Sequence, residues 1–322
     1  MGVGSIGERH LRCFQSTGIA DVSLCEVNPS LRKSVAERYN VAKTFDDLGQ
    51  ALNEKLDAAV ICTPAHLHIP MALQVAQKGV HVFIEKPLST TLDKIDLLGA
   101  EIVKRELTAG VAYVYRAHPA LAAMRKAICA GQFGEPVQIA ATAGQHFPFY
   151  RPAYRETYYK DRSTGGGAVQ DALTHIVNAA EWLVGPVTEL VADAAHQVLE
   201  DVEVEDTVHL ITRHNKILGS FTLNQHQAPN ESSLTVICKN GTARFEMHNS
   251  RWRWQIRPDD TWHDESAVQL ERDTLFRLQA ESFLRAMDGT SQPLCSLEEG
   301  RQTLRVNLSI LRSIEDRQWQ KL

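Results

Sequence analysis

The sequence predicts an α/β chain of two domains, and two patterns along it carry that prediction. Up to residue 117, apolar strand-like runs alternate with helical segments of roughly 10–15 residues, which is typical of βαβ units around a parallel sheet. From residue 118 onward, strand-like runs follow one another with turn residues between them, which indicates antiparallel pairing. We therefore predict a first domain at residues 1–117 and a second, α+β domain at residues 118–322 with a large, mostly antiparallel open sheet.

The composition is that of a globular protein with an ample core. Of its 322 residues, 43% are hydrophobic and 23% are charged, and the net charge is −5. This balance argues against nucleic acid or a membrane surface as the main partner. No signal peptide is visible, and no apolar run is long enough to span a membrane. The six cysteines show no metal-binding spacing and suit a reducing compartment, so we expect a cytoplasmic protein without a metal site.

A glycine fingerprint opens the chain. Gly2, Gly4 and Gly7 fit the pattern G-x-G-x-x-G, and a helix is expected to start around Ser5 and Ile6. Glycines there permit a tight turn and close approach of a pyrophosphate, which then faces the helix N-terminus. We predict that these five residues bind a dinucleotide in a Rossmann-like parallel sheet. The first strand of that sheet is missing from the sequence. Either the true start lies upstream or the chain is a truncated product, and a chain without this strand could be inactive.

An acidic residue follows at the distance expected for a ribose contact. A strand expected at 21–27 carries Glu26, which lies 19 residues beyond Gly7. An acid about 20 residues after the glycines binds the adenosine ribose hydroxyls. It would also repel a 2′-phosphate, which favours NAD, although Arg32 and Lys33 keep NADP open. The alternative is that Glu26 only places a negative charge near the helix that begins around Pro29.

Polar residues follow the ends of three further expected strands. Thr63, Pro64 and His68 come after a strand at 57–63, and Glu85-Lys86-Pro87 ends the apolar run that begins at His81. Arg116 follows a strand expected at 109–115. In open α/β sheets, ligands bind outside the carboxyl ends of the strands. The alternatives are a solvated charge pair at Lys86 and a structural role for a lone histidine.

These motifs together resemble one family. The glycine fingerprint, T-P-x-x-x-H at 63–68 and E-K-P at 85–87 have the order and spacing of the Gfo/Idh/MocA oxidoreductases, which include glucose–fructose oxidoreductase and inositol dehydrogenase. The similarity continues through residues 118–136 and covers nearly the whole chain. It implies an NAD(P)-dependent dehydrogenase that acts on a hydroxyl carbon of a sugar, cyclitol or related polyol. The residues implied at the cofactor are Thr63, Pro64, His68, Glu85, Lys86 and Arg116.

The second domain supplies a possible acid/base group. Three glycines, 165–167, precede a helical pattern in which Asp171 and His175 lie four residues apart and share one face. On their own they could be an N-terminal acid and a packed histidine. The family's GG…D…H pattern implies that both are catalytic and bind substrate together with Lys86. His175 would then be the general base, and Asp171 would orient the substrate or tune His175. Lys86 would stabilise the developing oxyanion or complete the proton relay. Asn178 stands where the family often has an aspartate, which leaves the substrate class open.

A loop at residues 145–160 is rich in aromatic and arginine side chains. Aromatic faces stack on sugar rings, and arginines bind carboxylate or phosphate groups in a forked geometry. We therefore predict substrate binding by part of this loop, with Tyr150, Arg151, Arg155 and Tyr159 as the candidates. A domain or subunit contact is the alternative.

The antiparallel region predicts a subunit interface. Strands are expected at 187–195, 206–213, 217–225, 232–238, 242–247 and 252–257, and two amphipathic helices at 272–287 and 297–315 close the chain. An exposed sheet face carrying Phe221, Leu223 and Trp252 would need covering. In the family that the chain resembles, this face joins subunits, so we expect a homo-dimer or homo-tetramer through the C-terminal sheet.

Two other functions remain open on the sequence. One is a non-catalytic NAD(P)-binding regulator, although the retained Lys86, Asp171 and His175 argue against it. The other is an NAD-dependent lyase or glycosidase that oxidises one sugar carbon transiently. Such oxidation acidifies the neighbouring carbon and permits elimination, so product would form without net NADH.

Overall fold

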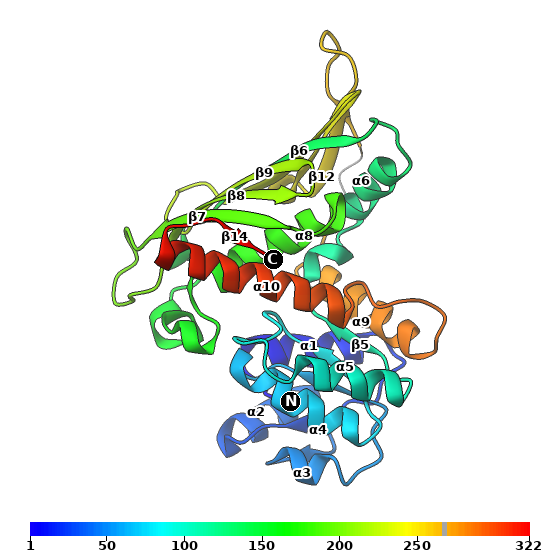
Figure 1. Ribbon diagram of the computed structural model, residues 1–322. Helices are drawn as coiled ribbons and strands as arrows, with labels where there is room; N and C mark the ends of the chain where they lie inside the picture. Colours follow the sequence, from blue (N-terminus) through cyan, green and yellow to red (C-terminus); the bar gives the residue numbers. More distant parts are fainter. Residues whose placement is uncertain (266–268) are drawn as a thin grey trace. The chain divides into compact units, whose positions relative to one another are not determined.

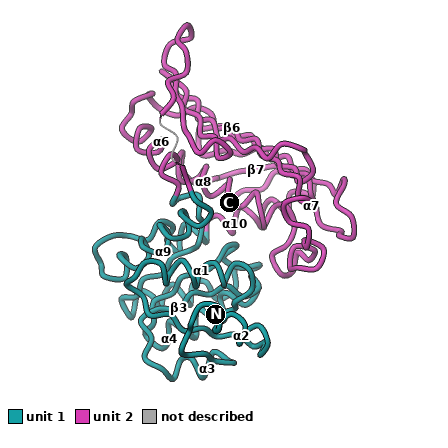
Figure 2. Tube along the Cα trace, turned by 180° about the vertical axis from the view of Figure 1, so that it is seen from behind, with its two compact units in different colours: residues 1–117, 271–301 teal, residues 118–270, 302–322 magenta. Residues whose placement is uncertain are grey.

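The computed structural model describes residues 1–265 and 269–322, which form two compact units. Unit 1 comprises residues 1–117 and 271–301, and unit 2 comprises residues 118–270 and 302–322 (Figure 2). The predicted boundary between residues 117 and 118 coincides with a unit boundary. Residues 271–301, however, group with the first unit, whereas the sequence analysis assigns them to the second domain.

Residues 271–301 group with unit 1 because helix α9 (Thr274–Met287) packs on helix α1 (Ser5–Ser16). Phe283 of α9 lies against Phe14 and Phe83, with ring centroids 6.5 and 4.8 Å apart. The guanidinium of Arg12 donates two hydrogen bonds to Asp273, at 2.5 and 2.9 Å. The apolar side of α9 is thereby buried within unit 1 and stabilises it.

Unit 1 contains the predicted parallel strands in two short sheets. Strands β3 (Ala58–Ile61), β4 (His81–Ile84) and β5 (Ala109–Val111) form one sheet, and β1 (Leu24–Cys25) pairs with β2 (Thr44–Phe45). The first residues of the chain lie between the two sheets. The Met1 amino group donates to the Val60 carbonyl and the Gly2 N–H donates to the Cys25 carbonyl. These residues therefore link the two sheets through hydrogen bonds of the backbone and the terminal amino group.

Helices connect these strands as the alternating pattern predicts. They are α2 (Pro29–Tyr39), α3 (Leu48–Ala51), α4 (His68–Gln77) and α5 (Ile95–Lys104). Asn28 caps α2 by accepting hydrogen bonds from the Ser30 and Leu31 N–H groups, and Pro29 occupies the first turn, where its missing N–H costs nothing. Strand β5 is shorter than predicted, because a 3-10 turn takes residues 114–117.

Within the described residues of unit 2, nine strands form one sheet in the order β13-β12-β11-β10-β6-β9-β8-β7-β14. All neighbouring pairs are antiparallel except β6 with β9. The bounds are β6 (Pro136–Gly144), β7 (Glu189–Ala195), β8 (Thr207–His214), β9 (Ile217–Asn224), β10 (Glu231–Cys238), β11 (Gly241–Glu246), β12 (Arg251–Gln255), β13 (His263–Asp264) and β14 (Gln320–Lys321).

Strand β6 is absent from the predicted elements, and its presence changes the expected topology. Strand β6 lies between β9 and β10, so the predicted continuous run of hairpins is wrong at that point. Its sequence P-V-Q-I-A-A-T-A-G is rich in alanine, which has a weak preference for strands. Strand β6 takes its place in the middle of the sheet by pairing with β9 and β10, whose partner residues come about 80–100 positions later in the chain.

Helices cover one face of this sheet (Figure 1). Helix α6 (Pro119–Cys129) packs on β11 and β12, and α8 (Thr174–Val184) packs on β6. Helix α10 (Leu297–Asp316) joins them from residue 302 onward, where Ser313 accepts a hydrogen bond from the β7 backbone. Among the described residues, no helix combines the length and the apolar character needed to cross a membrane.

The predicted exposure of Phe221, Leu223 and Trp252 is wrong. These side chains are only 1%, 4% and 6% exposed, because strand alternation points them toward the helices. The opposite, open face instead presents Ile211 and Leu218, which are 51% and 48% exposed on β8 and β9.

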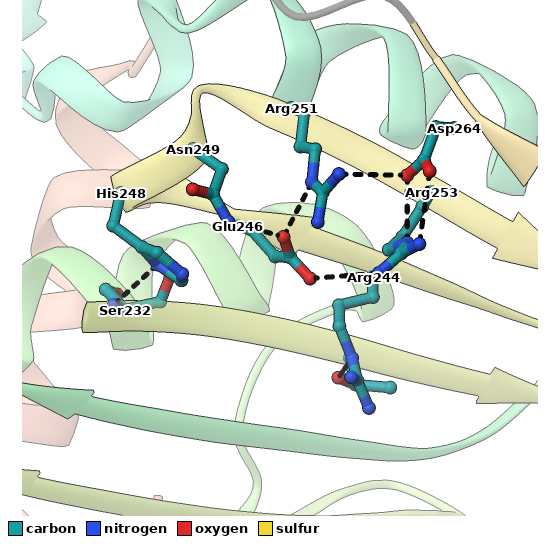
Figure 3. Close-up of polar contacts among 9 residues, drawn as sticks. Ser232, Arg244, Glu246, His248, Asn249, Arg251, Arg253 and Asp264 are labelled. Carbon is teal, nitrogen blue, oxygen red and sulfur yellow. Dashed lines mark hydrogen bonds and ion pairs between the residues drawn. The ribbon is translucent and has the colours of Figure 1, made fainter. Parts of the chain in front are cut away.

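An ion-pair network occupies the β11–β13 end of the open face (Figure 3). Glu246 lies 2.7 Å from Arg251 and 3.8 Å from Arg253, and Asp264 lies 2.9 Å from Arg253 and 3.4 Å from Arg251. Burial raises the pKa of Glu246. The hydrogen bonds that it accepts from Asn249 and Arg251, together with the arginine charges, lower the pKa by more, so it lies below its ordinary value. The network holds three adjacent strands of the sheet together.

Candidate active site

The glycine turn in unit 1 has the shape of a phosphate cradle. Gly2 has φ +76°, and a Cβ on it would lie 2.9 Å from the Cys62 carbonyl oxygen. A Cβ on Gly7 would lie 1.9 Å from the Gly2 carbonyl oxygen, so neither position accepts a larger residue. Gly4 is the N-cap of α1, has open space beside it, and supplies no side chain to the N–H groups of the first turn. This arrangement fits an anion at the helix N-terminus.

Glu26 is fixed beside that turn. Its Oε2 atom accepts a 2.9 Å hydrogen bond from the Val3 N–H, and its Oε1 atom accepts a 3.0 Å bond from the Asn28 N–H. Each carboxylate oxygen has a further lone pair, so both can still accept bonds from ribose hydroxyls. The guanidinium of Arg32 donates to the Glu26 carbonyl oxygen at 2.6 Å. The carboxylate is therefore held in a fixed orientation beside the glycine turn.

His68 joins the Thr63-Pro64 turn to the E-K-P turn. Its ring is buried, with Nδ1 lying 3.0 Å from the Pro87 carbonyl oxygen and Nε2 lying 2.7 Å from the Thr63 carbonyl oxygen. Burial lowers the pKa of His68, so the ring is neutral near pH 7 and donates to one carbonyl at a time. His68 is predicted to lie at the cofactor, but its side chain is buried between these two turns, within hydrogen-bond distance of both.

Lys86 lies half-buried at the carboxyl end of β4, and the preceding Glu85 is buried. Glu85 accepts the Lys86 backbone N–H at 2.9 Å, and its other oxygen lies 2.6 Å from Nε2 of His10. Sequence reasoning missed His10. The signal that could have found it is a histidine three residues beyond Gly7, on the buried side of α1.

Arg116 is buried in unit 1. Its guanidinium donates to the Leu294 carbonyl oxygen at 3.1 Å and to the Glu299 carboxylate. Burial raises the pKa of Glu299, but the Arg116 charge and the hydrogen bonds from Ser296 and Arg116 lower it more. These contacts tie the turn at residues 114–117, which follows β5, to Leu294 and to the first turn of α10.

In unit 2, Asp171 lies in a π-helical turn, Val169–Leu173, that leads directly into α8. Single π-turns inside helices occur often at functional sites. Asp171 and His175 are both partly buried, and their four-residue separation keeps them on one side of the helix. Asn178, one turn further, is fully buried, and its amide donates to Thr303 of α10 at 3.0 Å.

Tyr158, which is absent from the predicted candidates, contacts one of them directly. Its hydroxyl donates a 2.5 Å hydrogen bond to Oδ1 of Asp171. Gly166 allows this approach, because a Cβ on it would lie 2.6 Å from the Tyr158 carbonyl oxygen and 2.2 Å from that of Tyr159. The glycine run before the helix is therefore needed to bring this loop close to Asp171.

The structure separates the four loop candidates for substrate binding. Tyr159 is buried among Phe147, Tyr154 and other apolar residues, and its hydroxyl donates to Gln225. Burial also raises the pKa of Tyr159. Arg155 donates to Asp201 and lies over the Tyr154 ring, whereas Tyr150 and Arg151 are exposed. Tyr150 and Arg151 are thus accessible in the way that substrate contact requires, and Tyr159 is part of the loop core.

A parallel α/β unit with a glycine cradle and an acid fixed beside it defines a dinucleotide-binding class of protein. Residues 1–113 match a model described as "Oxidoreductase family, NAD-binding Rossmann fold", and residues 121–244 match the GFO/IDH/MocA C-terminal domain. The two consecutive matches span most of the sequence. The chain belongs to the Gfo/Idh/MocA oxidoreductase family.

Individual relatives are distant in sequence and close in fold. Levoglucosan dehydrogenase of Pseudarthrobacter phenanthrenivorans is 28% identical over half of this chain and 42% of its own length. UDP-N-acetylglucosamine 3-dehydrogenase of Acidithiobacillus ferrooxidans is 24% identical over 98% of this chain and 97% of its own. A levoglucosan dehydrogenase structure, complexed with NADH and levoglucosan, superposes with a TM-score of 0.90 at 20% identity, over 99% of this chain and 97% of its own. That likeness extends to the fold of both units.

Proposed function

We propose that this chain is an NAD-dependent dehydrogenase acting on a hydroxyl-bearing carbon of a sugar or cyclitol. The observation that carries the proposal is the phosphate cradle of Gly2 and Gly7 with Glu26 fixed beside it, in the same unit as Lys86 at the end of β4. In open α/β sheets, ligands bind at the carboxyl ends of the strands, and Lys86 lies at such an end.

The cofactor would be held mainly through the start of unit 1. The pyrophosphate would bind the backbone of Gly4, Ser5 and Ile6, and Glu26 would accept hydrogen bonds from the adenosine ribose. The carboxylate disfavours a 2′-phosphate, and Arg32 is already bonded to a carbonyl oxygen, so NAD is favoured over NADP. Thr63, Pro64, His68, Glu85, Lys86 and Arg116 remain the further candidates for cofactor contact or support.

The proposed chemistry divides between cofactor and protein. The nicotinamide, when bound, accepts the hydride from the substrate carbon. His175 accepts the hydroxyl proton on a ring nitrogen as the carbonyl forms. Asp171 orients the substrate, and the Lys86 ammonium stabilises negative charge that develops on the oxygen. In the reverse direction, His175 returns the proton to the oxygen.

Relatives and loop residues support the substrate class. The relatives named above are dehydrogenases of levoglucosan and of UDP-N-acetylglucosamine, both of which contain sugar rings. Tyr150 and Tyr158 are 44% and 46% exposed, so their rings can pack against a sugar face. Arg151 beside them can bind an anionic group of the substrate.

We also propose an oligomer and a compartment. The open face of the unit 2 sheet, with Ile211 and Leu218 half-exposed, would pair with a second copy to form a homo-dimer or homo-tetramer. The six cysteines, all free thiols in the structure, support placing the enzyme in the reducing cytoplasm.

The test starts with calorimetric titration by NAD and by NADP, followed by an NADH-forming assay with free sugars, cyclitols and UDP-N-acetylglucosamine. We expect NAD to bind more tightly than NADP. Lys86→Ala should lower kcat about 100-fold or more while the Kd for NAD changes less than about threefold. Lys78→Ala, which removes an exposed lysine of the same unit, is the control. Full turnover by Lys86→Ala would contradict the assignment.

Two other outcomes identify the rival functions. Tight NAD binding without turnover of any sugar would point to a regulator. Product formation without net NADH would point to a lyase or glycosidase that oxidises its substrate transiently.

A further inference from the structure

The residue that precedes Lys86, Glu85, carries a buried carboxylate. Glu85 is 5% exposed, and each of its oxygens has a partner. Oε1 lies 2.6 Å from Nε2 of His10, a residue 75 positions earlier in the sequence. Oε2 accepts the backbone N–H of Lys86 at 2.9 Å. One carboxylate thus joins helix α1 to the residue that carries the proposed catalytic ammonium.

A carboxylate in this position is costly unless its partners are well placed. Burial of a charged group is unfavourable, and removing one partner of a buried pair is strongly destabilising. Burial raises the pKa of Glu85, but the hydrogen bond and charge of His10 and the charge of Lys86 lower it below its ordinary value. Glu85 is therefore ionised at neutral pH inside the core, and an apolar residue there would avoid the whole cost.

Aromatic rings fix the orientation of His10. Its ring meets Phe83 and Phe276 edge-on, with centroids 5.7 and 5.5 Å away, and lies 6.4 Å from Phe14. These rings come from β4, α9 and α1 and leave the imidazole 2% exposed. A histidine packed in this way has little rotational freedom, so Nε2 stays directed at Glu85.

We propose that His10 and Glu85 are positioning residues that fix the backbone of Lys86 relative to the glycine turn. His10 lies one turn into the helix whose N-terminus would take the cofactor phosphates, and Glu85 bonds the N–H of Lys86 itself. The pair therefore connects helix α1, which follows the glycine turn, to the backbone of Lys86 through two hydrogen bonds. This role rests on the proposed function of Lys86, and neither residue touches the reacting atoms.

Two amide substitutions separate positioning from packing. The side-chain nitrogen of His10→Gln reaches the place of Nε2, whereas that of His10→Asn is one methylene too short. We expect kcat of His10→Asn to fall about tenfold or more below that of His10→Gln, because displacement of about 1 Å in a catalytic group has effects of this size. The Kd for NAD and the KM for the sugar should differ by less than about threefold between the variants.

His214 provides the matched control. It is a buried histidine of unit 2, and its Nδ1 lies 2.7 Å from the Gly185 carbonyl oxygen. His214→Gln and His214→Asn should differ in stability and share the same kcat. Equal kcat values for His10→Gln and His10→Asn would overturn the proposal.

A second readout needs neither cofactor nor substrate. In the protein alone, the chemical shift of the Lys86 amide in a ¹H–¹⁵N spectrum reports its hydrogen bond to Glu85. The change of this chemical shift in Glu85→Gln measures the effect of the carboxylate charge. We expect the resonance to stay in place in His10→Gln and to move in His10→Asn. An unmoved resonance in His10→Asn would overturn the pairing. If the wild-type protein turned over no sugar, the proposed function would fail while this spectrum still tested the pair.

Discussion

The hydroxyl of Tyr158 donates a 2.5 Å hydrogen bond to Oδ1 of Asp171. This distance lies at the short end of O–H···O⁻ bonds, which are about twice as strong as neutral ones. The bond constrains the carboxylate on the side of the helix that also carries His175. A loop predicted to bind substrate or to make a domain or subunit contact thus orients a proposed catalytic residue.

Tyr158→Phe removes this bond and keeps the ring. We expect kcat/KM for the sugar to fall about tenfold or more, because a hydrogen bond to a charged group contributes about 1.5–3 kcal/mol. Steady-state kinetics checks this, and Tyr39→Phe is the control, since Tyr39 makes the same kind of bond to Glu8 at 2.7 Å. Unchanged kcat/KM in Tyr158→Phe would show that Asp171 does not depend on it.

Glu26→Gln tests the ribose contact. The amide oxygen keeps one acceptor for the Val3 N–H, but the negative charge is lost. We expect the NAD affinity to fall about tenfold and the preference for NAD over NADP to narrow, because a neutral side chain no longer repels a 2′-phosphate. Calorimetric titration of both cofactors measures this. Glu37→Gln, on the exposed side of α2, should match the wild type.

His118 makes unit 2 sensitive to acid. Its Nδ1 caps α6 by accepting the Ala120 N–H, its ring packs edge-on to Phe245, and burial lowers its pKa to about 4. The unfolded chain binds its proton near pH 6.5, so this stability is complete above pH 6.5 and is lost as the pH falls toward 4. Between pH 7 and pH 5 the loss from this residue should be about 2 kcal/mol.

His118→Asn keeps a good N-cap and removes the titration. The variant should lose about 2 kcal/mol less than the wild type between pH 7 and pH 5 in urea unfolding. All five tryptophans lie in unit 2, so their fluorescence follows the relevant unit. His209→Asn, on an exposed strand position, should show the wild-type pH dependence. An identical loss in His118→Asn would refute the assignment.

The open sheet face can be tested with one charge. Ile211→Asp places a carboxylate on the proposed interface, where it would be desolvated and unpaired. We expect the mass from light scattering to drop to that of the monomer, while the fold remains intact by circular dichroism. Val103→Asp changes an equally apolar, 79% exposed side chain on α5 of unit 1 and should leave the assembly unchanged. An Ile211→Asp variant with the wild-type mass would rule this face out as the interface.

Local chemistry made much of the molecule predictable from the sequence. Strand and helix periods located most elements to within a few residues, and the positions of Gly2 and Gly7 follow from a turn that no larger side chain fits. The E-K-P and GG…D…H motifs could be recognised because their residues are close together in the chain.

The sequence by itself determined features that depend on neighbouring residues. These are the βαβ alternation, the glycine turn, and the placement of Asp171 and His175 on one side of a helical segment. Only the tertiary structure decided that β6 separates β9 from β10 and that Phe221 faces the helices. It also decided that His10 meets Glu85 across 75 positions and that Arg12 meets Asp273 across 261. The physical reason is that such contacts depend on how faces are buried and on which strands pair, and a single chain offers many alternatives of similar local energy.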